Sequence, residues 1–155
     1  MTASRRAFLI GTTAVAAAAA IPSWAAAVPP MHVLKDPNCG CCGAWIEILR
    51  TDGFDVTVEN TSWDALNRFK LSNGLPENMT SCHTGKIGGY LIEGHVPVAD
   101  IRRLLDERPD AIGLSVPGMP YGSPGMGPES EREAYDVFLL RRDGSAEVFT
   151  HYAAG

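Results

Sequence analysis

Three of the four cysteines in this 155-residue chain stand within four positions, in the run Cys39-Gly40-Cys41-Cys42. The fourth, Cys82, comes much later and is followed directly by His83. Thiolates at such density act either as nucleophiles in disulfide exchange or as ligands of a soft metal ion. The spacing of the sulfurs helps to compare these two chemistries.

Cys39 and Cys42 have the C-x-x-C spacing of thiol–disulfide oxidoreductases. Apolar residues then recur at helical spacing, which predicts a helix over about 41–52 with the cysteines at its start. The free N–H groups and positive dipole end of a helix N-terminus lower the pKa of nearby thiols. Because the thiolate is both the nucleophile and the metal ligand, this feature leaves both chemistries open.

The additional Cys41 favours a metal site. Adjacent Cα atoms lie about 3.8 Å apart across a trans peptide, whereas a disulfide needs roughly 4.4–6.8 Å, so Cys41 and Cys42 are not expected to pair. A third thiol invites wrong pairing in a redox enzyme, but each added thiolate strengthens a metal site. Cu(I) accepts two or three thiolates, and bridging sulfurs can gather several copper ions. Zinc prefers a closed tetrahedral set of four ligands, which makes it the less suitable metal here.

The elements around the cysteines predict a thioredoxin-like α/β fold, with a central mixed sheet, flanking helices and a C-terminal β-hairpin. The turn dipeptide Asp143-Gly144 marks the hairpin. The expected elements are strands over 31–35, 54–59 and 89–93, helices from Ser62 and from Pro97, a Gly- and Pro-rich loop over 113–128, and hairpin strands over 135–141 and 146–152.

Cys82 is expected to join the other cysteines in such a fold. The turn before the third strand of a thioredoxin-like sheet faces the helix start that carries the C-x-x-C motif. The run Ser81-Cys82-His83-Thr84 stands just before the expected third strand. The alternative is that Cys82 is buried and inert, with His83 on the surface.

Four further residues are candidate auxiliary ligands. His83 adjoins Cys82, and His95 follows Gly94 close to the expected third strand, where it could instead serve a structural hydrogen bond. Met119 and Met126 lie in the Gly- and Pro-rich loop, and thioethers bind Cu(I). Ordinary loop packing is the alternative for both methionines.

Residues 1–27 are expected to be a signal peptide of the twin-arginine type, which leaves a single domain over 28–155. The run Ser4-Arg5-Arg6-Ala7-Phe8-Leu9 precedes an Ala-rich apolar stretch, and small residues at Ala25-Ala26-Ala27 suit a cleavage site. An uncleaved anchor is the alternative, but the apolar stretch is short for a span of about 20 residues. We therefore expect a periplasmic protein with no stable membrane span after cleavage.

The charge of the chain argues against a nucleic-acid partner. The formal net charge is −5, and it becomes about −7 once Arg5 and Arg6 leave with the signal peptide. An acidic domain with scattered basic residues lacks the positive patch that phosphate binding requires. It suits a protein that meets cations.

Four motifs follow one another in a fixed order along the chain. They are Cys39-Gly40-Cys41-Cys42-Gly43 with Trp45, then Ser81-Cys82-His83-Thr84, then Gly89-Tyr90-Leu91-Ile92-Glu93-Gly94-His95-Val96-Pro97, and last Pro117-Gly118-Met119-Pro120 with Gly122-Ser123-Pro124-Gly125-Met126.

Together these motifs resemble the CopG-type copper-resistance family, also called domain of unknown function 411. The resemblance covers essentially all of the chain after the signal peptide. It implies a periplasmic thioredoxin-like protein for copper tolerance or handling, in which Cys39, Cys41, Cys42 and Cys82 bind Cu(I), with a cluster of several ions as one option.

The implied partners are copper ions and periplasmic copper-efflux or copper-oxidation proteins. The residues leave open whether the chain also catalyses a copper or thiol redox reaction. A thiol–disulfide oxidoreductase that uses Cys39 and Cys42 is the alternative function, and a zinc-stabilised structural or partner-binding domain is a third.

Overall fold

The computed structural model describes residues 28–155, so the predicted signal peptide lies outside the described residues. Within 28–155, none of the helices combines the length and apolar character needed to cross a bilayer. The elements, in order, are β1 (Met31–Lys35), α1 (Gly40–Thr51), β2 (Val56–Asn60), α2 (Trp63–Ser72), η1 (Glu77–Met79), β3 (His83–Ile87), β4 (Tyr90–Glu93), α3 (Val98–Glu107), β5 (Gly113–Ser115), η2 (Glu129–Glu131), β6 (Tyr135–Leu140) and β7 (Ala146–Tyr152).

The strands form one mixed sheet in the order β2-β1-β3-β4-β5-β6-β7. β1 runs parallel to β2 and antiparallel to β3, and β4 is antiparallel to β3. This β-α-β-α-β-β-α order, with β3 reversed, agrees with the thioredoxin-like arrangement expected from the sequence. β5 then adds parallel to β4, and the antiparallel pair β6–β7 closes the sheet. The predicted mixed α/β class and C-terminal hairpin are confirmed.

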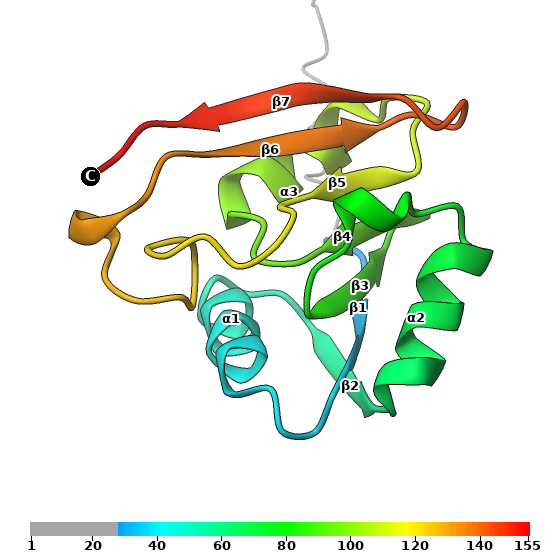
Figure 1. Ribbon diagram of the computed structural model, residues 1–155, viewed down its shortest axis with the longest axis horizontal. Coiled ribbons are helices and arrows are strands. Elements are labelled where there is room, and N and C mark those ends of the chain that lie inside the picture. Colours follow the sequence, from blue (N-terminus) through cyan, green and yellow to red (C-terminus); the bar gives the residue numbers. More distant parts are fainter. Residues whose placement is uncertain (1–27) are drawn as a thin grey trace, which may run out of the picture.

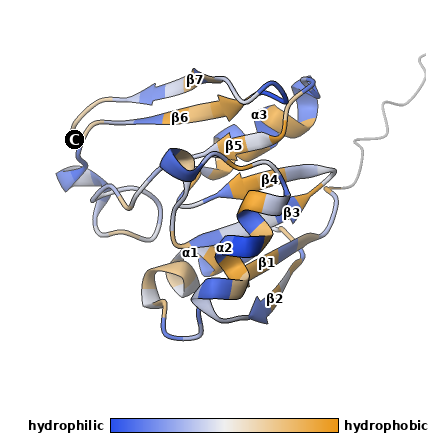
Figure 2. Cartoon of the chain, turned by 45° about the vertical axis from the view of Figure 1, so that its right-hand side comes forward, coloured by the Kyte–Doolittle hydropathy of each residue, from blue (hydrophilic) through white to orange (hydrophobic). Residues whose placement is uncertain are grey.

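The helices cover both faces of the sheet, with α1 and α2 on opposite sides of β1 and β3 (Figure 1). Trp45 and Leu49 of α1 and Ile101 of α3 belong to one large cluster of buried apolar side chains. A smaller cluster that includes Leu91 receives the apolar side of α2 through Phe69. The inner strands β4 and β6 are largely hydrophobic, whereas the edge strand β2 is mostly hydrophilic (Figure 2).

Local signals fixed the ends of two helices as predicted. The Ser62 hydroxyl accepts a hydrogen bond from the amide of Ala65 at 3.3 Å and so caps α2. Gly53 follows the end of α1 with a φ of 91°, a left-handed conformation that glycine adopts without steric cost.

Two strands differ from the sequence prediction. The strand expected at 89–93 is the fourth, β4, because His83–Ile87 forms β3 before it. The expected loop over 113–128 begins with the short strand β5 at Gly113–Ser115. A Cβ atom on Gly113 would overlap the Leu91 carbonyl, so close backbone approach between β4 and β5 explains a glycine inside a strand.

Candidate metal centre

Helix α1 presents the cysteine run at its first turn. Cys39 is the N-cap residue, and its sulfur forms a disulfide with that of Cys42 across a Cα–Cα distance of 5.4 Å. Cys41 and Cys82 are free thiols. The prediction that the adjacent cysteines do not pair is confirmed, and the C-x-x-C pair forms instead.

Cys82 converges on this cluster from the neighbouring strand. It immediately precedes β3, and His83 pairs in register with Lys35, the last residue of β1 before the loop to α1. The sulfurs of all four cysteines lie within 4.8 Å of one another. The sulfurs of Cys39 and Cys41 are 3.5 Å apart. The expected convergence of the four sulfurs is thus observed, while their role as ligands stays a prediction.

Two histidines face the sulfur of Cys82. His83 Nδ1 and His95 Nε2 each lie 3.3 Å from the Cys82 sulfur. The His83 ring is fully buried against the indole of Trp45, with ring centroids 4.3 Å apart, so the alternative of a surface histidine is wrong. His95 Nδ1 donates a hydrogen bond to the Pro124 carbonyl at 2.8 Å. In the neutral ring this leaves the Nε2 lone pair of His95 directed toward Cys82.

Burial sets the protonation of these groups. Desolvation lowers the pKa of His83 well below its usual value, and electrostatic repulsion from His95 and Lys70 acts in the same direction. Desolvation also lowers the pKa of His95, against the hydrogen bond to Pro124. Both rings are therefore neutral near pH 7, the form that binds metals. Burial, with Cys41 nearby, raises the pKa of Cys82 to about 11, so a metal must displace its proton.

A buried ion pair holds the residue that precedes Cys82. Lys70 Nζ donates to the Ser81 carbonyl at 2.5 Å and to Glu93 Oε1 at 2.6 Å. The Ser81 amide donates to the same carboxylate at 2.6 Å, and the Ser81 hydroxyl donates to the Gly118 carbonyl. Sequence reasoning missed Lys70, Ser81 and Glu93 as site residues. The one signal was a lysine placed on the apolar side of a predicted helix.

The Gly- and Pro-rich loop packs on the first turn of α1. A Cβ atom on Gly125 would lie 2.8 Å from the backbone nitrogen of Trp45 and 3.1 Å from the carbonyl oxygen of Cys41, so only glycine allows this approach. In the same loop Met126 is half-buried, whereas Met119 is 53% exposed. The roles of both methionines as ligands stay predictions.

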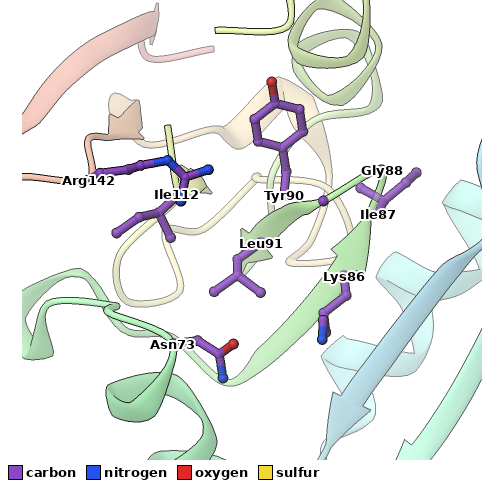
Figure 3. Close-up of a pocket in the computed structure, with 9 residues that line it drawn as sticks. Asn73, Lys86, Ile87, Gly88, Tyr90, Leu91, Ile112 and Arg142 are labelled. Carbon is purple, nitrogen blue, oxygen red and sulfur yellow. The ribbon is translucent and has the colours of Figure 1, made fainter. Parts of the chain in front are cut away.

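A separate pocket of about 390 Å³ lies at the opposite end of β3 and β4, beside their connecting turn (Figure 3). Its wall includes Lys86, Tyr90 and Arg142, but no cysteine or histidine. Cys82 precedes the other end of β3. This pocket is therefore distinct from the sulfur cluster.

Two solved structures resemble the chain over nearly their whole length. The structure titled "Copper resistance protein copG- Form 2" is 47% identical, with a TM-score of 0.73, over 80% of this chain and 98% of that one. The structure titled "Copper resistance protein copG- Form 1" is 46% identical, with a TM-score of 0.75, over 81% of this chain and 99% of that one. The chain belongs to the CopG copper-resistance family. The resemblance predicted from the motifs is confirmed.

Two further comparisons cover shorter parts of this CopG-family chain. The family described as "Protein of unknown function, DUF411" matches residues 79–126, which include Cys82, His83 and His95. An L-serine dehydratase from Dictyostelium discoideum is 33% identical over 81 residues, 48% of this chain. The chain spans only 23% of that dehydratase.

The donor set of this CopG-family chain fits a thiophilic metal. Four converging sulfurs supply the soft ligands that Cu(I) prefers, and two neutral imidazoles reach one of these sulfurs. The disulfide removes two of the four thiolates from this set. Metal binding by all four sulfurs and closure of the disulfide therefore exclude each other.

Proposed function

We propose that the chain is a periplasmic Cu(I)-binding protein of copper tolerance, in which copper is the cargo. The observation that carries this proposal is the convergence of the sulfurs of Cys39, Cys41, Cys42 and Cys82 within 4.8 Å. The related CopG proteins are named for copper resistance, which supports the choice of copper.

Cu(I) suits this arrangement better than zinc. Three of the sulfurs come from four consecutive positions, which is cramped for a closed zinc tetrahedron but allows low-coordinate, bridged Cu(I). Several copper ions can share such sulfurs. The proposed auxiliary ligands are His83 and His95 on the β3–β4 side, and Met119 and Met126 in the covering loop.

Copper loading on all four sulfurs requires the reduced protein. Two electrons and two protons from a dithiol reductant convert the Cys39–Cys42 disulfide into two thiols, and the reductant becomes a disulfide. Cu(I) then displaces the thiol protons. Transfer of two electrons from Cys39 and Cys42 to a disulfide oxidant, which becomes a dithiol, would re-form their disulfide, withdraw two ligands and favour copper release.

The proposed location and partners rest on the N-terminal sequence and on the chemistry of the cargo. A twin-arginine signal over residues 1–27 would export the chain to the periplasm. Protein partners would be those that remove or oxidise periplasmic copper.

Anaerobic titration of the reduced full chain with Cu(I) tests this function. We expect more than one tightly bound copper per chain, and fewer after Cys41→Ser or Cys82→Ser. His32→Gln is a matched control, because His32 is an exposed histidine that contacts Thr57 and Glu59 on β2. Binding of no more than one equivalent, or unchanged binding after Cys41→Ser, would count against the proposal.

The second candidate function is a thiol–disulfide oxidoreductase. The observation that favours it is the closed Cys39–Cys42 disulfide at the start of α1. In that case a variant with both Cys41→Ser and Cys82→Ser should reduce a model disulfide as fast as the unaltered chain. A large loss of rate in this variant would argue against the oxidoreductase.

A further inference from the structure

We propose that Cys82, His83 and His95 form a distinct site that binds one divalent ion of the Zn(II) or Cu(II) type while Cys39 and Cys42 are joined in their disulfide. This inference deepens the proposed function and rests on it, because Cys82 belongs to both ligand sets. The oxidised chain would then bind a different metal ion from the one that the reduced chain binds.

The three donor atoms are spaced as ligands of one ion. The Cys82 sulfur lies 3.3 Å from His83 Nδ1 and 3.3 Å from His95 Nε2, and all three atoms lie within 4.8 Å of one another. An ion with bonds of about 2.3 Å to sulfur and 2.0–2.1 Å to nitrogen, at near-tetrahedral angles, separates those ligands by about 3.5 Å. Only small movements are needed to admit the ion.

Within residues 28–155, weak hydrogen bonds to sulfur are the only hydrogen bonds that join these three donors to one another. His95 Nδ1 donates to Pro124, so its Nε2 presents a lone pair to Cys82. The Cys82 thiol can donate its proton to His95 Nε2, and a proton on His83 Nδ1 can in turn point at the sulfur. The other ring nitrogen of His83, Nε2, is buried and has no hydrogen-bond partner among residues 28–155. A metal ion between the three donors would replace the two sulfur–nitrogen contacts with ligand bonds to the Cys82 sulfur, His83 Nδ1 and His95 Nε2.

The disulfide decides which metal fits. The disulfide between Cys39 and Cys42 uses none of the three donors of the second group, so Cys82, His83 and His95 all remain available to a metal ion. Cys41 belongs to the sulfur group but not to the group of Cys82, His83 and His95. One sulfur and two imidazoles suit Zn(II) and Cu(II), whereas Cu(I) prefers the thiolate-rich reduced cluster. Three protein ligands also leave one coordination position open.

Binding at this site involves no electron transfer. The divalent ion replaces the proton of the Cys82 thiol, which leaves to solvent, and both imidazoles bind through neutral nitrogens. The buried wall formed by His83 and Trp45 keeps one side of the site dry. Cys82 is therefore the ligand common to the reduced and oxidised states.

Titration of the oxidised full chain with Co(II), a probe that does not oxidise thiols, tests the inference. We expect one equivalent to bind, with a sulfur-to-cobalt charge-transfer band. Cys82→Ser should abolish the band, and His95→Gln should weaken binding by at least about 10-fold. Cys41→Ser should retain the band, as should His32→Gln, the exposed-histidine control. Absence of the band from the unaltered chain, or its persistence after Cys82→Ser, overturns the inference.

X-ray absorption of the unaltered, oxidised chain loaded with Zn(II) provides a second measurement that needs no variant. We expect one sulfur and two imidazole nitrogens around the ion. Two or more sulfurs, or no imidazole, would overturn the inference even if a variant failed to fold. Cu(I) titration of the same preparation after reduction reports separately on the proposed function, so failure of one leaves the other measurable.

Discussion

The ammonium of Lys70 lies 2.6 Å from a carboxylate oxygen of Glu93, and both side chains are fully buried. Burial raises the pKa of Glu93, whereas the Lys70 charge and the donors on Ser81 and Thr84 oppose that shift. The pair also binds both backbone groups of Ser81. Two elements, α2 and β4, thereby position the residue next to the Cys82 sulfur.

Removing one partner of this pair should be costly. Lys70→Met leaves the Glu93 carboxylate buried without its counter-charge, and we expect a loss of about 3–5 kcal/mol in the free energy of unfolding. The double variant Lys70→Met with Glu93→Met should recover most of this loss. Urea unfolding measures both effects.

The exposed pair between Arg142 and Asp110 serves as the control. The two side chains are 65% and 84% exposed, so Arg142→Ala should cost no more than about 1 kcal/mol. Equal losses in the free energy of unfolding for Lys70→Met and Arg142→Ala would show that burial does not make the Lys70–Glu93 pair more important to stability than an exposed pair.

Elements with local signals were predicted well, whereas those held by distant partners were not. The Ser62 cap and the Asp143-Gly144 turn act within a few residues, and both were read correctly. β3, by contrast, begins with polar residues that are buried because of partners elsewhere in the chain. Thr84, for example, donates to Glu93 at 2.6 Å. No local pattern reveals such a partner.

The same distinction holds for the site. The convergence of Cys82 on the α1 cysteines followed from the expected fold, since the strand order determines which turn faces the helix. The positions of the His83 and His95 rings depend on packing against Trp45 and on the Pro124 carbonyl. Those contacts join segments far apart in the sequence, so the two histidines could only be named as candidates.

Gly94 tests how tightly the Cys82 segment is packed. Its φ is 72°, and a Cβ atom there would lie 2.6 Å from both the Ser81 hydroxyl and the Val116 carbonyl. Gly94→Ala should therefore destabilise the fold in two ways. The alanine must adopt a left-handed conformation, and its Cβ atom must also be accommodated among crowded neighbours, which should cost about 1–3 kcal/mol more. It should also displace Ser81 and lower Cu(I) binding.

Gly89→Ala is the matched control for Gly94→Ala. Gly89 has a φ of 92°, but no atom lies within 4 Å of the Cβ position. Its replacement should cost only the conformational term, about 1–2 kcal/mol. If thermal unfolding shows the same loss for both variants, the crowding at Ser81 contributes nothing.

The thiol of Cys82 should react only at high pH in the oxidised chain. Burial raises its pKa to about 11, and the neighbouring Cys41 acts in the same direction. Because the thiolate is the nucleophile, the rate of iodoacetamide labelling at Cys82, followed by mass spectrometry of its peptide, should keep rising until about pH 11. In the unfolded chain the rate should level off once the pH passes the ordinary thiol pKa of about 8.5.

The same shift links the stability of the chain to pH. The folded state binds the Cys82 proton more tightly than the unfolded state does, so this thiol stabilises the fold fully below its unfolded pKa. That contribution is lost as the pH rises through the folded pKa of about 11. Cys82→Ser should flatten the decline in unfolding free energy over this range. A labelling rate that levels off below pH 9 in the folded chain would contradict the raised pKa and the stability trend together.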